Sequence, residues 1–301
     1  MSVFIAMFKR NVKLFFKDKG LFFTSLITPL ILLVLFVSFL GNVYKDSFDQ
    51  IFTALKFNVD ESIIQALVSG QLLSSLLAVS CVTVSFCSNM LMVQDKVNGV
   101  RKDLLITPVK RSTLAFSYYL ASLASTLIVC YTALIACFIY VAIVGWYFTF
   151  IDVLSLVLDV FILTTFGTAL SSLINYFLSS QGQISAVGSI VSSVYGFICG
   201  AYMPLSNLGE GLRKVIMFLP GTYGTSLMRN HALGSAFSKL EGAGCSPQVI
   251  EEIKNLVDCN IFFFENKVSI GTMYIVVIST IAVCVGAYVL INVLSKKKKG
   301  V

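Results

Sequence analysis

The sequence predicts an all-α integral membrane protein that crosses the bilayer six times. Of its 301 residues, 57% are hydrophobic and only 12% are charged. Six apolar stretches are each long enough to cross a hydrocarbon core of about 30 Å as a helix. Their apolar residues are continuous and do not alternate with a period of two, which favours helices over a β-barrel.

The six predicted spans form one transmembrane domain over residues 21–294. The third stretch is longer than a perpendicular span requires, which indicates tilt or an interfacial end. From the N-terminus, the spans are Leu21–Gly41, Leu67–Val93, Thr113–Trp146, Val153–Leu178, Ile184–Met203 and Ser269–Leu294.

Residues 1–20 have the pattern of an amphipathic helix. Phe4, Phe8, Val12 and Phe15 recur at helical spacing, and the other face carries Lys9, Lys13 and Lys17. This pattern predicts a helix that lies in the inner membrane interface. The alternative is that the segment simply extends the first span.

The distribution of charge predicts the orientation of the chain. With both termini in the cytoplasm, the inner segments hold fourteen basic residues and three acids, and the outer segments hold eight basic residues and eleven acids. This asymmetry is the positive-inside pattern. It places Val97–Thr113 and the basic tail 295–301 inside, and the loop 205–268 outside. The net charge of +7 therefore indicates contact with anionic membrane lipids and no nucleic-acid partner.

The sequence contains no signature of catalysis. It has neither a G-x-S-x-G elbow nor a G-x-x-x-x-G-K-[ST] phosphate loop, so the chain is not expected to be an enzyme or to hold a cofactor. Its single histidine, His231, belongs to no metal-ligand pattern, so no metal site is expected. Six of the eight cysteines lie in apolar stretches. Cys245 and Cys259 lie in the outer loop, and we predict that they form a disulfide.

Asp159 is the one ionisable residue placed deep in a predicted span. A carboxylate inside a membrane is a functional candidate, here as a proton relay. The alternative is a structural residue that is hydrated or snorkels, because the outer end of the span is only about six residues, or roughly 9 Å, away.

The inner loop VNGVRKDLLITPVKRST, between the second and third spans, has a distinctive pattern. Asn98 and Gly99 punctuate a short helix, and Pro108 ends it before the third span. The loop resembles the coupling helix of type-2 ABC transporter permeases, which reads approximately E-x-x-x-G-T-x-x-x-L-L-x-T-P-x-x-R. Two positions differ, because Asp95 replaces the glutamate and Val100 the threonine. The remaining matches are Gly99, Leu104, Leu105, Thr107, Pro108 and Arg111, with Arg101, Lys102 and Asp103 between them.

A second stretch, MPLSNLGEGLRKVIMFLPGTYGTSLMRNHALG, is similar to the segment that follows the fifth span in the same family. There the family has a proline, then short outer helices around P-x-T-Y, then an arginine and a glycine. Gly209 stands where the family often has a second proline. The matching residues are Pro204, Leu208, Leu212, Pro220, Thr222, Tyr223, Arg229 and Gly234.

The resemblance implies the membrane subunit of an ABC exporter in the plasma (inner) membrane of a bacterium. ATP and Mg would be bound by a separate cytoplasmic ATPase, into which the leucines of the inner loop dock. A second permease, identical or related, would complete the pathway. We expect the substrate to be a lipophilic small molecule, drug or peptide. The alternatives are a permease of the same family for lipid-linked polysaccharide, or a membrane scaffold or immunity protein outside the ABC class.

Small and polar residues in two spans suggest roles in assembly and transport. Gly188, Ser192, Gly196 and Gly200 are each four residues apart, a spacing that allows close helix packing. The partner of this stripe is either a second permease or a neighbouring span of the same chain. With Asp159, the residues predicted to line a mildly polar pathway are Ser74, Ser85, Ser88, Ser185 and Ser189.

Overall fold

The computed structural model describes residues 3–54, 57–205 and 208–294, without the side chains of Ala54, Gln181 and Ser185. The basic tail 295–301 lies outside the described residues. The helices are α1 (Val3–Lys17), α2 (Lys19–Leu35), the π-helix η1 (Phe36–Leu40), α3 (Gly41–Ala54), α4 (Glu61–Val97), α5 (Val100–Ile106), α6 (Arg111–Val144), α7 (Phe150–Phe177), α8 (Gln181–Ile198), α9 (Glu210–Ile216), α10 (Pro220–Gly242), α11 (Pro247–Leu256) and α12 (Ile270–Leu294). A small antiparallel hairpin pairs β1 (Phe262–Phe263) with β2 (Asn266–Lys267).

The prediction of an all-α membrane protein is confirmed in part, because the described residues are nearly all-α but include a short β-hairpin. Among the described residues, five helical segments are long and apolar enough to cross a membrane, and they correspond to the first four predicted spans and the sixth. The fifth predicted span corresponds to α8, whose 18 residues make it shorter than the others. The count of six spans therefore stays a prediction. The first segment also continues past its predicted end, because the helix runs on through η1 and α3.

The N-terminal segment is a helix of its own and does not extend the first span. Asp18 separates α1 from α2, and its carboxylate accepts a hydrogen bond from the Leu21 amide at 3.1 Å as the N-cap of α2. Met7, Asn11 and Phe15 form the buried face of α1. The three lysines predicted for the opposite face, Lys9, Lys13 and Lys17, are exposed.

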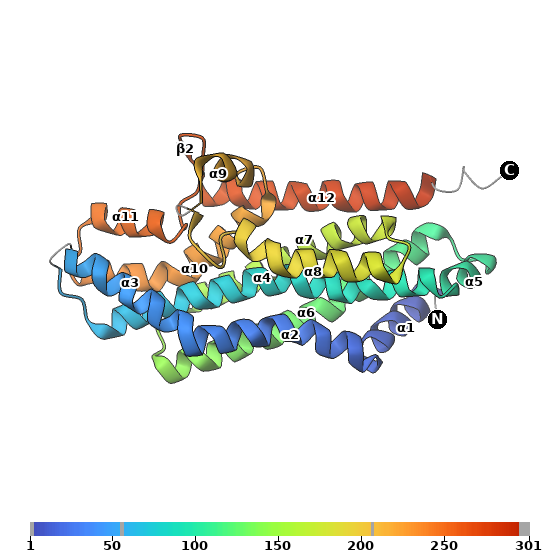
Figure 1. Ribbon diagram of the computed structural model, residues 1–301, viewed down its shortest axis with the longest axis horizontal. Helices are drawn as coiled ribbons and strands as arrows, with labels where there is room; N and C mark the ends of the chain where they lie inside the picture. Colours follow the sequence, from blue (N-terminus) through green and yellow to red (C-terminus); the bar gives the residue numbers. More distant parts are fainter. Residues whose placement is uncertain (1–2, 55–56, 206–207, 295–301) are drawn as a thin grey trace.

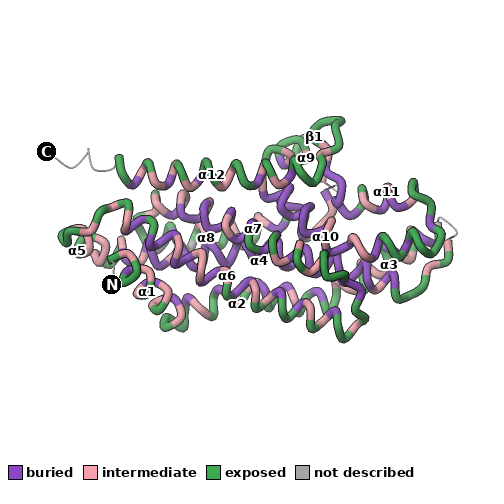
Figure 2. Tube along the Cα trace, turned by 180° about the vertical axis from the view of Figure 1, so that it is seen from behind, coloured by how far each residue is buried: buried purple, intermediate pink, exposed green. Residues whose placement is uncertain are grey.

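The core of the fold is α4, which its neighbours surround on all sides. Of its most apolar window of 18 residues, 94% is buried, compared with 17% for α12. Figure 2 shows this contrast between the central helix and the outer ones. Several polar residues of α4 pair with neighbouring helices: the Ser88 and Thr126 hydroxyls are 2.8 Å apart, and the Asn89 amide donates to Ser172 at 2.9 Å. Because lipid offers no hydrogen bonds, such internal pairing is required.

The segment after α8 differs from the predicted outer loop with short helices. α10 is 23 residues long and packs against α4, α7 and α12, so it belongs to the core. Its small residues allow this approach, since a Cβ on Gly224 would lie 2.4 Å from Leu163 and a Cβ on Gly70 of α4 would lie 2.6 Å from the Ala232 carbonyl oxygen. Arg229 and His231 of α10 both contact other helices, at Ser75 of α4 and Asp159 of α7.

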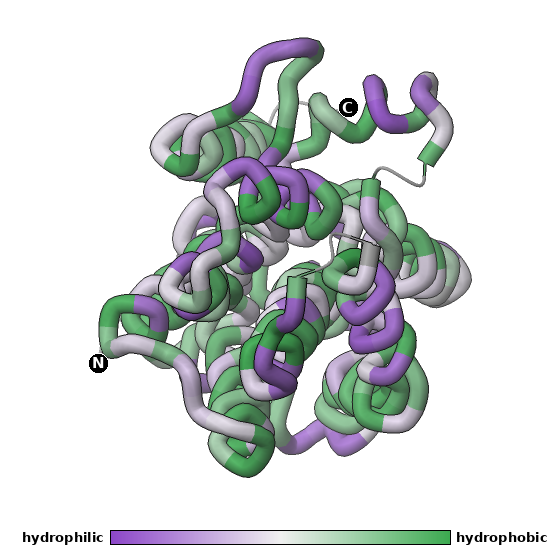
Figure 3. Tube along the Cα trace, turned by 90° about the vertical axis from the view of Figure 1, so that its left-hand side faces the viewer, coloured by the Kyte–Doolittle hydropathy of each residue, from purple (hydrophilic) through white to green (hydrophobic). Residues whose placement is uncertain are grey.

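The bundle has two distinct ends. Figure 1 shows α1, α5 and the last turn of α12 at one end, and α3 and α11 at the other. Seen from the second end, hydrophilic residues gather on the loops and short helices of that end (Figure 3). Two of the segments predicted to be cytoplasmic, α1 and α5, thus lie at the same end of the molecule.

We predict that Gly167→Ala destabilises the bundle, because it disturbs the close contact between α7 and α4. A Cβ at this position would lie 2.8 Å from the Cys81 carbonyl oxygen and 3.0 Å from the Val82 Cα, and a backbone atom cannot easily give way. Overpacking of this kind costs about 1–3 kcal/mol. Thermal unfolding in detergent, followed by a thiol-reactive dye on the buried cysteines, should show a lower Tm.

The matched control is Gly286→Ala in α12, where an added Cβ meets nothing within 4 Å. This change should leave the Tm unchanged or raise it, since alanine favours a helix over glycine by up to about 1 kcal/mol. An equal loss in both variants would contradict close packing at Gly167 as the cause.

Candidate functional site

The connection between α4 and α6 forms a short projecting helix. Gly99 has φ of 82°, a conformation that favours glycine, and it turns the chain from the end of α4 into α5. The Thr107 hydroxyl donates to the Leu104 carbonyl oxygen at 2.6 Å, and Thr107 itself is extended. Pro108 follows, and the next helix begins at Arg111. The short helix predicted from Gly99 and Pro108 is thus present as α5.

The hydrophobic residue that α5 presents to the surroundings is Ile106, which is 84% exposed. Leu104 and Leu105, which the sequence predicted would be displayed, are only half-exposed and pack against the buried cluster around Met92 and Tyr118. Lys102 lies on the exposed side of α5. The prediction failed because Leu104 and Leu105 lie on the face of α5 that turns toward the bundle. Also exposed are Asp103, Thr107 and Pro108, and Arg111 is half-exposed.

Asp95 anchors the last turn of α4 inside the bundle. Its carboxylate accepts hydrogen bonds from the Arg10 guanidinium of α1 at 2.7 and 3.2 Å, and from the Tyr118 hydroxyl of α6 at 2.5 Å. The hydrogen bond to Asp95 raises the pKa of Arg10 above its ordinary value, although burial opposes this. Asp95 is buried, so it holds α1, α4 and α6 together and presents no surface to a partner.

Arg101 connects α5 to the ends of two other helices. It donates to the side-chain oxygen of Asn292 in α12 at 3.0 Å, and its guanidinium lies 5.6 Å from the centroid of the Tyr176 ring in α7. Next to it, Lys96 donates to the carbonyl oxygens of Tyr176 and Leu178 at 2.9 and 2.7 Å. A cation at these final carbonyls caps the end of α7. The ends of α7 and α12 are therefore joined to α5 and to the last turn of α4 by polar contacts. Sequence spacing alone did not indicate these contacts.

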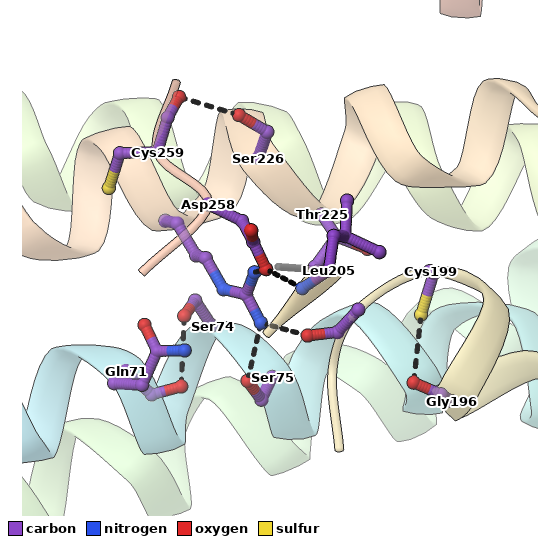
Figure 4. Close-up of polar contacts among 12 residues, drawn as sticks. Gln71, Ser74, Ser75, Gly196, Cys199, Leu205, Thr225, Ser226, Asp258 and Cys259 are labelled. Carbon is purple, nitrogen blue, oxygen red and sulfur yellow. Dashed lines mark hydrogen bonds and ion pairs between the residues drawn. The ribbon is translucent and has the colours of Figure 1, made fainter. Parts of the chain in front are cut away.

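Further back along α4, near Ser75, Arg229 of α10 forms a second buried network, shown in Figure 4. It pairs with Asp258 at 3.1 Å, donates to Ser75 of α4 at 3.4 Å, and donates to the Gly200 carbonyl oxygen at the end of α8. Asp258 also accepts from the Leu205 amide at 2.8 Å. A buried guanidinium requires such partners because removing a charge from water is costly.

The other residues of the second motif support α10. Pro220 occupies the first turn of α10, where a missing N–H costs nothing. The Tyr223 hydroxyl donates to the Met217 carbonyl oxygen at 2.6 Å, and a Cβ on Gly234 would touch the Asp152 carboxylate at 3.4 Å. Pro204 directly precedes Leu205, whose amide binds Asp258. The residues of the motif therefore stabilise the start of α10 and the chain that leads into it.

Asp159 is fully buried, so its side chain does not snorkel to the surface. Its carboxylate lies 2.6 Å from His231 Nδ1 of α10 and accepts from the Tyr274 hydroxyl of α12 at 2.8 Å. It lies nine residues after the start of α7, about 14 Å along the helix. Burial lowers the pKa of His231, but the Asp159 hydrogen bond and charge, with the charge of Asp152, outweigh it and raise that pKa. The three side chains join α7, α10 and α12.

The serines predicted to line a pathway lie mostly inside the helix bundle. Ser74 donates to the Gln71 carbonyl oxygen, while Ser85 and Ser88 bind groups on α7 and α6, and all three are buried. They therefore do not line an open path within this chain. Ser189 is exposed on α8, and the side chain of Ser185 lies outside the described residues.

Contacts within the chain also cover the small-residue stripe of α8. A Cβ on Gly188 would lie 3.0 Å from Met90 of α4, and one on Gly196 would lie 2.2 Å from the Tyr202 ring. The Tyr202 hydroxyl reaches the Ser192 carbonyl oxygen at 3.5 Å. Gly200 has φ of 73° and ends α8 in a turn. Of the two alternatives, the structure favours packing within the subunit.

The disulfide predicted between Cys245 and Cys259 is not formed in the structure, where both are free and buried thiols. The two residues flank opposite ends of α11, whose ten residues span about 15 Å. Bridged cysteines have Cα atoms less than about 7 Å apart. The sequence could not show that a helix keeps the two residues apart.

Taken together, the apolar helices and the short helix α5 define a multi-pass membrane protein with one projecting connection at the end of a buried central helix. The family model described as ABC-2 type transporter matches residues 2–232, and the chain belongs to this family. The matched region includes α1, α5 and most of α10. A search among curated proteins finds no significant match.

We predict a pH-dependent contribution of His231 to stability. Because its pKa is raised from 6.5 in the folded protein, the charged pair with Asp159 stabilises the fold fully below about pH 6.5, and this contribution is lost as the pH rises through the raised pKa. The Tm difference between wild type and His231→Gln in detergent should therefore be largest at acidic pH and shrink toward alkaline pH.

His231 is the chain's single histidine, which makes this difference easy to assign. Tyr274→Phe is the control, because it removes a hydrogen bond to the same carboxylate without removing a group that titrates near neutral pH. A wild-type advantage over His231→Gln that grew with rising pH would contradict the assignment.

Proposed function

We propose that this chain is the permease subunit of an ABC exporter, which forms a translocation pathway with a second permease and is driven by a separate cytoplasmic ATPase. Membership of the ABC-2 family supports this role. The observation that carries the mechanism is the short helix α5, which lies at one end of the bundle. It exposes Ile106 next to the charged residues Lys102 and Asp103. ATP and Mg belong to the partner ATPase in this proposal.

In this proposal, α5 enters a groove on the ATPase with Ile106 as its apolar anchor. Lys102 and Asp103 remain at the rim, where exposed ion pairs contribute at most about 1 kcal/mol. Leu104 and Leu105 act on the opposite side, where they hold α5 on its own bundle. The two termini and α5 then lie in the cytoplasm of a bacterium whose inner membrane holds the protein, and α3 and α11 lie outside.

The cargo proposed for this exporter is a lipophilic small molecule, drug or peptide. Charges are few in the described spans, and the polar groups of α4 face neighbouring helices of the same chain. The path itself is proposed to lie between two permeases. A permease for lipid-linked polysaccharide remains the alternative within the family.

We predict that Ile106→Ser weakens binding of the ATPase without unfolding the permease. Burying one isoleucine is worth roughly 1.5–3 kcal/mol, which corresponds to about a tenfold to hundredfold change in Kd. The measurement is recovery of an ATPase with a phosphate loop on tagged permease isolated from native membranes, followed by titration of the purified pair.

Ile106→Leu is the control, because it keeps the apolar volume and should retain the ATPase. Replacing Leu104 and Leu105 is less informative, since their loss also loosens the packing of α5 on its own bundle. Undiminished ATPase binding by the Ile106→Ser permease would refute α5 as the docking element.

We further predict that Arg101→Ala keeps ATPase binding but prevents the bound ATPase from moving α12. Arg101 binds Asn292 at 3.0 Å and faces inward, so its loss should leave docking intact and remove the link between α5 and α12. Hydrogen exchange of the last turns of α12 should respond to ATP in the wild-type complex and become insensitive in Arg101→Ala.

Lys102→Ala is the matched control, because it removes an adjacent exposed cation of the same helix. It should preserve the response of α12 to ATP. If the Arg101→Ala complex keeps a wild-type response, the Arg101–Asn292 contact is not the transmitting link.

A further inference from the structure

A cavity of about 800 Å³ lies at the end of the bundle that carries the hairpin. Its walls come from α9, the segment after α11 and the β1–β2 hairpin. Figures 1 and 2 show α9 beside the hairpin, near the beginning of α12. The volume lies within the range of sites that bind small molecules.

The charged residues that line this cavity differ in whether they are already paired. Lys214 is paired with Glu210 at 2.7 Å on the exposed rim. Asp258 is engaged by Arg229 and by a backbone amide. Arg213 is half-buried on the wall and interacts electrostatically with the Glu210 and Asp258 carboxylates, but among the described residues its guanidinium forms no hydrogen bond or ion pair. It is therefore the cation best placed to take an anion from outside the chain.

Glu265 is the other charged residue of the lining without an ion pair among the described residues. It lies in the turn of the hairpin and is exposed, so water solvates its carboxylate. The half-buried position of Arg213 gives a bound anion a stronger interaction than the exposed Glu265 can give a cation.

The uncharged part of the lining includes polar residues (Thr222, Asn255, Asn260 and Asn266) and apolar ones, and the apolar part continues onto the surface. Met217, Phe262 and Phe264 contribute to the walls. On the outside of α9, Leu212 and Val215 are exposed, although α9 is no membrane span. Phe218, exposed one turn further on, packs edge-on against Phe263 with ring centroids 5.3 Å apart. Such an apolar face on a short surface helix suits the interface between membrane and water.

We propose that this cavity binds an anionic amphiphile, with Arg213 holding the charged group and Met217, Phe262 and Phe264 contacting the apolar body. Only the suggestion that the ligand is outgoing cargo rests on the proposed export function. The same chemistry would be met by an anionic lipid from the adjacent leaflet. Both sources present a negative group on an apolar body, and the test distinguishes them.

The test uses three photo-crosslinking probes of equal length: a diazirine-bearing dodecanoic acid, the corresponding alcohol and the corresponding amine. The full-length permease is placed in nanodiscs of phosphatidylcholine without the ATPase, and crosslinked peptides are mapped by mass spectrometry. The acid should label the cavity walls roughly tenfold more than the alcohol or amine, since the charge-assisted contact to Arg213 is available to it alone.

Arg213→Gln should abolish the preference for the acid, and Arg213→Lys should retain much of it. Lys214→Gln and Glu265→Gln are the matched controls and should keep the preference for the acid. All four variants are first shown to unfold at the same Tm as the wild type, so that a change in labelling does not reflect loss of the fold. Equal labelling by the three probes, or an unchanged preference in Arg213→Gln, would overturn the proposal. Preferred labelling by the amine, lost in Glu265→Gln, would overturn it as well, because the ligand would then be a cation.

A final arm identifies the source of the ligand. Competition by phosphatidylglycerol in the nanodisc, with or without ATPase and ATP, supports an anionic lipid as the occupant. A change in labelling by the acid only when the ATPase turns over ATP supports cargo. If no ATPase associates at all, the export proposal fails while the acid preference of the cavity remains measurable.

Discussion

The burial of α4 on every side is the constraint on which the rest of this structure depends. A helix of 37 residues within one chain needs enough neighbours to cover it, and here α2, α6, α7, α8 and α10 supply that cover. Polar side chains on such a helix need partners within the protein, because neither water nor lipid is available. The hydroxyl and amide pairs with α6 and α7 are the consequence, and they fix which faces of these helices meet. Close contacts at Gly70 and Gly167 bring backbones together where side chains would keep them apart.

Two charged networks contact α4, one near its last turn and one within its length. Near the last turn, Asp95 binds Arg10 and Tyr118, only four residues before the turn at Gly99 that leads into α5. Within the length of the helix, Ser75 accepts a hydrogen bond from Arg229, which also binds Asp258. A close-packed helix moves largely as a unit, since its neighbours leave no space in which it could deform locally. A displacement that begins at α5 therefore acts on a helix that also contacts the second network.

Much of the fold could be predicted from the sequence, because continuous apolar stretches report directly on membrane spans. The punctuation by Gly99 and Pro108 likewise predicted α5, since both residues restrict the backbone locally. What failed depended on contacts distant in the sequence. α10 was predicted as part of an outer loop with short helices, and the contacts that hold it in the bundle, from Arg229 to Ser75 and from His231 to Asp159, join residues 154 and 72 positions apart. The roles of Leu104, Leu105 and Ile106 depended on helical phase relative to a bundle that no local pattern reveals.

The cavity near the hairpin and the central helix are connected by a short chain of side chains. Asp258 lines the cavity and binds Arg229, and Arg229 in turn contacts Ser75 of α4. Asp258 has φ of 55°, an unfavourable conformation for a residue with a side chain, so its position is held by these contacts. A shift of α4 at Ser75 would therefore change the wall that faces Arg213. Coupling between two sites is reciprocal, so whatever free energy a displacement of α4 adds to ligand binding, the ligand adds to that displacement. Binding at the cavity and docking at α5 would then bias the same helix at two different points.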